Sequence, residues 1–121
     1  MSHPIVHIEL SAENHQEMAK WYGEVFGWKS EAYPDMNYST FNSGEGSLGG
    51  GFNPITEEAP AGTVVVYINC DDINEMVSKI EANGGKVVVP PMPIPTVGQI
   101  AQFIDPSGNL MAVIQPEEGG M

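Results

Sequence analysis

The sequence predicts an α+β fold built from two βαβββ modules, and three observations support this. Two short apolar runs rich in β-branched residues, at 5–10 and 64–68, each precede a helical pattern that opens on a capping residue. Each helical pattern ends at glycine and is followed by three further strand-like pieces. The same order of elements therefore occurs twice, at about residues 4–53 and 63–116, within one domain spanning residues 1–121.

The first module continues from its opening run into a helix. Asn14 is a residue type that caps helices, and Glu17 stands three residues later, where its side chain can bond back to the cap. Gly27 is suited to the left-handed residue that ends a helix. Apolar residues recur at helical spacing and predict the buried side, namely Met18, Tyr22, Val25 and Phe26. Strands are expected at 28–32, 38–42 and 48–52.

The second module repeats this arrangement after a connector at 53–62. Asp72 and Glu75 take the places of the cap and its partner. The remaining matches pair Met18 with Met76, Tyr22 with Ile80, and Gly27 with Gly85. Strands are expected at 86–89, 99–104 and 110–115. Four prolines between 90 and 95 predict a stiff loop at the rim of the fold.

The charge balance excludes several partners. The chain has 121 residues and a net charge of −12, from 16 acidic residues and 4 basic residues that are all lysine. Nucleic acids and anionic membranes are poor partners for such a surface, because binding them requires cations that neutralise phosphates. A neutral or cationic small molecule is compatible with it, although acidic surfaces also serve solubility alone.

Cysteine usage and hydropathy indicate a cellular location. Cys70 is the only cysteine, so an intramolecular disulfide cannot form. No basic-then-apolar signal segment opens the sequence, and no apolar run approaches the roughly 20 residues that span a bilayer. We expect a soluble, cytoplasmic protein.

The first strand carries the main candidate for chemistry. His7 and Glu9 stand two residues apart in the run 5–10, so a strand places both side chains on one face. Such a pair suits a general base with its partner, or a weak metal site completed by water. A third interpretation is that the two side chains only hydrogen-bond each other or nearby backbone. We favour this third interpretation over metal binding and leave acid–base chemistry open.

Other residues give weaker indications. Aromatic residues spaced through the strands could line a ligand pocket, and Tyr67 is the best candidate because it corresponds to Glu9 in the repeat; the others are Tyr38, Phe52 and Phe103. The glycines at 49–51 indicate a place where sheet or ligand approaches the backbone closely. We expect His3 and His15 to be solvated surface residues.

Three stretches together resemble the vicinal oxygen chelate superfamily, which includes glyoxalase I, extradiol dioxygenases and bleomycin resistance proteins. They are the strand 7–10, the segment Lys20-Trp21-Tyr22-Gly23-Glu24-Val25-Phe26-Gly27-Trp28, and the turn Asp105-Pro106-Ser107-Gly108-Asn109. The resemblance extends over about residues 5–115 and implies two βαβββ modules with curled mixed sheets around a cleft. It also implies a homodimer. The chain looks similar to the branch related to lactoylglutathione lyase.

The resemblance further implies where a divalent metal would bind. His7 stands at the first-strand ligand position, but the matching position of the second module is Val65. The last-strand positions fall on Ala112 and within 49–52, where no side chain can ligate. One donor of four is therefore kept, and we expect no metal cofactor, with a divalent ion at His7 disfavoured.

These observations leave three functions open. The first is a small-molecule-binding protein with an incomplete metal site, and the second is a metal-dependent lyase, isomerase or dioxygenase that uses His7 and Glu9. The third is an inert interaction or regulatory domain. The sequence contains no arginine, so it lacks the usual partner for a glutathione or carboxylate substrate, which argues against true glyoxalase I activity.

Overall fold

The computed structural model describes residues 3–57 and 59–117. The chain divides into two compact units, one at residues 6–65 and the other at residues 66–117 together with residues 3–5. Each unit contains one helix and one mixed sheet, as the repeat in the sequence predicted. Neither helix of the described residues is long and apolar enough to cross a membrane.

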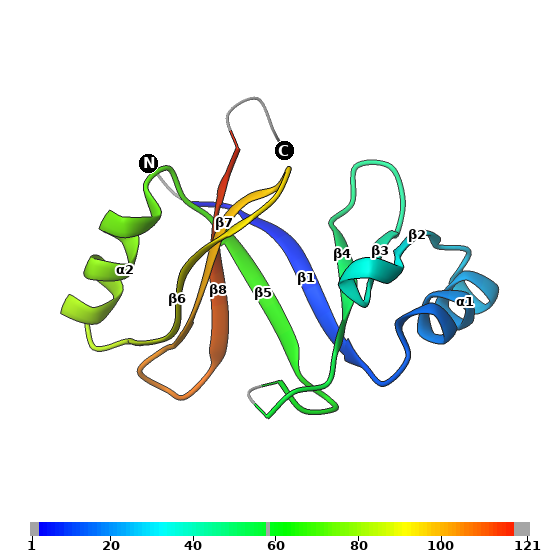
Figure 1. Cartoon of the computed structure of the whole chain (residues 1–121), viewed down its shortest axis with the longest axis horizontal. Helices are drawn as coiled ribbons and strands as arrows, with labels where there is room; N and C mark the ends of the chain where they lie inside the picture. Colours follow the sequence, from blue (N-terminus) through cyan, green and yellow to red (C-terminus); the bar gives the residue numbers. More distant parts are fainter. Residues whose placement is uncertain (1–2, 58, 118–121) are drawn as a thin grey trace. The chain divides into compact units, whose positions relative to one another are not determined.

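The first unit has a four-stranded sheet with one helix on its face (Figure 1). Its strand order is β2-β3-β4-β1, in which β4 and β1 are parallel and the other pairs are antiparallel. In chain order the elements are β1 (Ile5–Ala12), α1 (His15–Phe26), β2 (Lys29–Tyr33), the 3-10 turn η1 (Pro34–Met36), β3 (Tyr38–Asn42) and β4 (Gly49–Pro54).

Helix α1 begins and ends where the sequence predicted. The Asn14 side-chain oxygen accepts hydrogen bonds from the backbone N–H groups of Gln16 and Glu17, at 3.1 and 3.0 Å. Gly27 ends the helix in the left-handed conformation, with φ of 77°. The expected buried side is only half correct, because Val25 and Phe26 are more than half exposed. They are the last two residues of the helix and lie outside the core cluster beneath it.

The two faces of the first sheet differ in chemistry. The face toward α1 is apolar, with a core of Ala12, Ala19, Phe41 and Phe52 and, packed against it, Leu10, Met18, Tyr22 and Trp28. Strand residues alternate between faces, so the opposite face carries the polar positions of β1, β3 and β4. His7 pairs with Gly49, Glu9 with Gly51 and Ser11 with Asn53 across β1 and β4. The candidate residues of the first strand therefore stand on the face away from the helix.

The second unit repeats this plan with a different core. Its strand order is β5-β8-β7-β6, with β5 and β8 parallel and the rest antiparallel. The core beneath the helix consists of Cys70, Ile73, Ala101 and Val113, with Phe103 and Ile80 among the residues packed on it. The elements are β5 (Val64–Asn69), α2 (Ile73–Ala82), β6 (Lys86–Ile94), β7 (Gly98–Ile104) and β8 (Leu110–Pro116).

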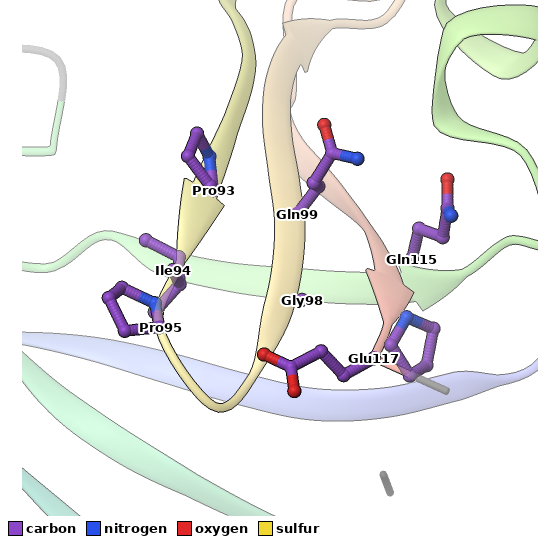
Figure 2. A pocket seen from close by; sticks show the side chains of 8 residues that line it. Pro93, Ile94, Pro95, Gly98, Gln99, Gln115 and Glu117 are labelled. Carbon is purple, nitrogen blue, oxygen red and sulfur yellow. The ribbon is translucent and has the colours of Figure 1, made fainter. Parts of the chain in front are cut away.

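Strand β6 corrects the predicted proline-rich loop. The strand runs on through Pro90, Pro91 and Pro93, with register shifts against β7 before residues 89 and 92. Proline is tolerated here because β6 is an edge strand, so a missing N–H removes no bond on its open side. Figure 2 shows Pro93 and Pro95 at the end of this strand, next to the turn into β7.

Candidate functional site

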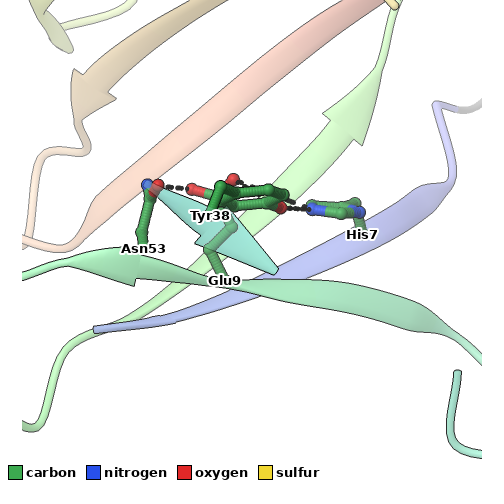
Figure 3. A network of polar contacts seen from close by, with 4 residues as sticks. All are labelled: His7, Glu9, Tyr38 and Asn53. Carbon is green, nitrogen blue, oxygen red and sulfur yellow. Dashed lines mark hydrogen bonds and ion pairs between the residues drawn. The ribbon is translucent and has the colours of Figure 1, made fainter. Parts of the chain in front are cut away.

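Four side chains form one polar network on the face of the first sheet that lies away from α1 (Figure 3). His7 and Glu9 come from β1, Tyr38 from β3 and Asn53 from β4. The Tyr38 hydroxyl lies 2.9 Å from His7 Nε2 and donates to Glu9 Oε2 over 3.1 Å. Asn53 Nδ2 donates to the other carboxylate oxygen, Oε1, over 2.7 Å. The predicted pair is thus part of a larger arrangement.

The directions of these bonds fix the form of the histidine. A phenol has one proton, and Tyr38 gives it to Glu9. The Tyr38 oxygen must therefore accept from His7, so the Nε2 atom of His7 carries a hydrogen. A continuous chain of donors then runs from the imidazole through the phenol to the carboxylate.

The carboxylate is the fixed point of the network. Glu9 is 8% exposed, although a carboxylate is rarely buried without partners. It accepts a bond at each oxygen, and His7 Nε2 lies 3.7 Å from Oε2. When the imidazole is protonated, its charge faces the carboxylate directly. Glu9 is thus held in place as an acceptor that a proton or a cationic group can approach.

The glycine-rich strand β4 makes room for the tyrosine. A β carbon on Gly51 would overlap the Tyr38 hydroxyl and ring, and one on Gly50 would overlap the Ile8 carbonyl oxygen. The sequence predicted a close approach to the backbone at 49–51, and the approaching groups are the ring of Tyr38 and the chain of β1. Gly51 thus allows the phenol to lie flat between His7 and Glu9.

The aromatic candidates do not all reach this network. Tyr38 belongs to it, whereas Phe52 has no exposed surface and packs beneath α1 on the opposite face. Phe103 packs beneath α2 in the second unit. Tyr67 is 3% exposed and pairs with Ala112 across β5 and β8. We leave Phe52 and Phe103 out of the proposed site because they belong to the two cores.

Sequence reasoning missed Asn53 and misplaced one histidine. Asn53 was assigned to a connector, but β4 continues to Pro54 and gives its side chain the same face as Glu9. His3 is exposed as expected, but His15 is buried and its Nδ1 lies 2.5 Å from Ser39 Oγ. The prediction for His15 was wrong because the first turn of α1 packs against β3. Extending strand β4 by one residue would have placed the Asn53 side chain on the same face as Gly51 and Glu9, because strand residues alternate between faces.

The residues do not fit a protein-held divalent metal. No group of three or more His, Cys, Asp or Glu side chains gathers anywhere in the described ranges. His7 Nε2 is directed at a phenol, and both oxygens of Glu9 accept hydrogen bonds from neutral donors. Val65 and Ala112 are buried apolar residues. Two donors that already bond to other side chains make only one edge of a coordination shell.

The fold and this face define a duplicated βαβββ protein with a buried carboxylate at a polar site. A family model of the Glyoxalase/Bleomycin resistance protein/Dioxygenase superfamily matches residues 4–113. The chain belongs to this superfamily, as the three stretches in its sequence indicated.

Two curated relatives agree with this assignment. A putative glyoxylase, CFP32, of Mycobacterium bovis is 34% identical over 81 residues, which cover 67% of this chain and 31% of that protein. A glyoxylase-like domain-containing protein of Didymella fabae is 31% identical over 113 residues, which cover 88% of each chain. The chain thus spans about a third of the mycobacterial relative's length.

Solved structures show the same fold at low identity. A superfamily member from Vibrio splendidus 12B01 superposes with a TM-score of 0.64 and 17% identity, covering 94% of this chain and 99% of that one. A methylmalonyl-CoA epimerase in complex with methylmalonyl-CoA and NH4+ gives 0.69 and 13% identity, covering 99% of each. A protein with this fold therefore binds methylmalonyl-CoA, and the fold alone does not select one activity.

Proposed function

We propose that this chain is a small-molecule-binding protein whose ligand lies on the polar face of the first unit and contacts Glu9. The carrying observation is that Glu9 is 8% exposed and held at both oxygens by Tyr38 and Asn53. A buried carboxylate is costly to desolvate, and this one is held in a fixed direction, which supports a role in ligand binding. The proposed ligand is a neutral or cationic organic molecule that donates a hydrogen bond.

The charge of the protein supports this ligand class. With a net charge of −12 and no arginine, the chain lacks the bidentate partner that carboxylate and phosphate ligands favour. A cationic ligand would also be drawn toward the surface at low salt. An anionic substrate would instead meet Glu9 without a compensating cation in the network.

A second candidate function is acid–base catalysis, and the bond chain favours it. The imidazole, the phenol and the carboxylate are linked in series. When His7 takes up a proton from a substrate, His7 can pass its Nε2 proton to Tyr38, and Tyr38 can pass its own proton to Glu9. This candidate keeps His7 and Glu9 as the reacting pair, and we propose that they work without a metal.

The test uses Glu9→Gln and Tyr38→Phe, which preserve side-chain size. Thermal-shift screening against small metabolites and cationic antibiotics would find hits, and calorimetry on each variant would then measure affinity. We expect a genuine ligand to lose at least tenfold in Kd with Glu9→Gln. Glu81→Gln on the exposed side of α2 is a charge-matched control. Unchanged affinity in Glu9→Gln would place the ligand elsewhere and reject the proposal.

We also propose three finer points. A homodimer is supported by the exposed apolar side chains of α1, Trp21, Val25 and Phe26, because large exposed apolar patches mark interfaces. Light scattering on the wild type and on Phe26→Glu tests it.

A cytoplasmic location is supported by the single buried cysteine. Membership of the branch related to lactoylglutathione lyase is supported by the sequence motifs, without implying glyoxalase activity.

A further inference from the structure

A concavity lies in the second unit, at one end of strands β6, β7 and β8 (Figure 2). Its volume is about 430 Å³, which is within the range of small-ligand pockets. The lining includes three prolines, Ile94, and the side chains Gln99, Gln115 and Glu117. None of these residues belongs to the polar network around Glu9.

The walls are rigid and apolar. Pro93 and Pro95 stand on the β6 side and Pro116 on the β8 side, and a proline ring has little freedom to lose when a ligand binds. The turn between β6 and β7 is closed by a bond from Val97 N–H to the Ile94 carbonyl, 3.0 Å long. Within that turn Thr96 adopts a φ of 66°, which is strained for a β-branched residue. Strain of this kind often accompanies functional loops.

Of the two glutamine side chains at the pocket, Gln115 has a structural hydrogen bond and Gln99 has none among the described residues. Gln115 Oε1 accepts from the backbone N–H of Ile73 over 2.8 Å, so it caps the start of α2. Among residues 3–57 and 59–117, no hydrogen bond is made by the side-chain amide of Gln99, which is half-buried on β7. An amide offers one acceptor oxygen and two donor hydrogens. Gln99 is therefore the polar group ready to meet a ligand.

The electrostatics favour a cation over an anion. Glu117 lines the pocket, and Asp71 and Asp72 precede the helix start that Gln115 caps. The two lysines of this unit are far away: Lys86 pairs with Ile104 at the opposite end of the sheet, and Lys79 is in the last turn of α2. The helix start offers little to an anion, because Gln115 and Asp72 already accept from its N–H groups.

The geometry points to a second ligand site here, one that takes a small organic cation: an ammonium group against Glu117, with an apolar ring against the proline rings. This inference does not depend on the proposed role of Glu9. The two sites lie in different units and share no residue.

Benzylammonium is the probe, with benzyl alcohol and benzoate as neutral and anionic analogues of the same ring. Titration of 15N-labelled protein, followed by NMR, reports on the Gln99 side chain and the Gly98 backbone. We expect saturable shifts at these groups at millimolar concentrations, with benzylammonium bound several-fold more tightly than benzyl alcohol and no saturation with benzoate.

Glu117→Gln removes the charge and keeps the shape, and Glu81→Gln, on the exposed side of α2, is the matched control. We expect Glu117→Gln to weaken benzylammonium binding by roughly threefold, the size of one exposed ion pair, and to leave benzyl alcohol unchanged. Gln99→Ala should weaken binding of both. Shifts that do not saturate, that occur around His7 and Glu9 instead, or that are unaffected by Glu117→Gln would each overturn the inference.

Discussion

The ring of Tyr38 lies over Gly51 so closely that a β carbon at residue 51 would overlap its hydroxyl. The pair belongs to neighbouring strands, since β3 and β4 align Thr40 with Gly51. Because of this contact, the conformation of the phenol depends on the absence of a side chain in the adjacent strand. The polar site therefore depends partly on a residue that has no side chain.

The first prediction concerns this contact. We expect Gly51→Ala to cost about 1–3 kcal/mol of unfolding free energy, because one added methyl group must displace the Tyr38 ring. In a Tyr38→Ala background the same change should cost much less, since the space is then open. Urea unfolding of the four proteins measures the coupling. Equal costs in both backgrounds would mean that Gly51 is constrained by the backbone of β4 alone.

The phenol itself should contribute to stability. Tyr38→Phe removes the hydroxyl that bridges His7 and Glu9, and it leaves Glu9 Oε2 without that donor. A loss of roughly 1–3 kcal/mol is expected for a bond to a buried charged group. Tyr33→Phe is the control, because Tyr33 is exposed on the edge strand β2 and should change stability by less than about 0.5 kcal/mol. A similar loss of unfolding free energy in both variants would contradict a stabilising role for the Tyr38 hydroxyl between His7 and Glu9.

The sequence alone was sufficient to predict the repeat and two of the four residues of the polar network, His7 and Glu9. Capped helices such as the one begun by Asn14 depend on local chemistry, so their positions are visible in a single chain. His7 and Glu9 share a face because strand alternation requires it. Tyr38 was among the candidates but without a stated partner, since the register between β1, β4 and β3 is set by long-range pairing.

Where sequence reasoning failed, tertiary context decided the outcome. Proline usually breaks a strand, yet β6 continues through its prolines because its outer edge needs no donors. Phe26 follows the helical apolar pattern but is 59% exposed, because it is the last residue of α1 and lies outside the core beneath that helix. His15 looked like a surface residue because nothing in the sequence shows that β3 brings Ser39 beneath it.

That buried pair gives a further prediction. His15 Nδ1 and Ser39 Oγ are bonded, with exposed fractions of 9% and 1%. His15→Ala should cost about 1–3 kcal/mol, because it removes packing and leaves the serine hydroxyl without this partner. Ser39→Ala should cost less, and the double variant less than the sum of both. A purely additive cycle, measured by urea unfolding, would show that the bond contributes nothing beyond packing.

Metal addition should have little effect on this protein. Tag-free protein titrated with Zn²⁺, Mn²⁺ or Ni²⁺ is expected to bind less than one equivalent at micromolar concentration, because the described side chains supply two donors at most. His7→Ala serves as the comparison, with elemental analysis as the readout. Stoichiometric metal in the wild type that disappears in His7→Ala would overturn the metal-free proposal.

Cys70 gives a prediction about alkaline pH. Burial, together with the smaller effect of the nearby carboxylates of Asp71 and Asp72, raises the pKa of its thiol from 9.0 to about 11. The folded state therefore keeps the proton at pH values where the unfolded chain has lost it. The resulting contribution to stability is fully present below pH 9 and is lost as the pH rises toward 11. Two pKa units correspond to roughly 2–3 kcal/mol at most.

The measurement is the unfolding free energy of wild type and Cys70→Ala between pH 8 and pH 11. Other groups also titrate in this range, so the difference between the two proteins is the informative quantity. Removing the buried sulfur should destabilise the variant at pH 8, because Cys70 is 1% exposed within the core beneath α2. The wild type should then lose that advantage progressively above pH 9, and the two curves should converge. Parallel curves would mean that the thiol ionises equally in both states, against the burial that the structure shows.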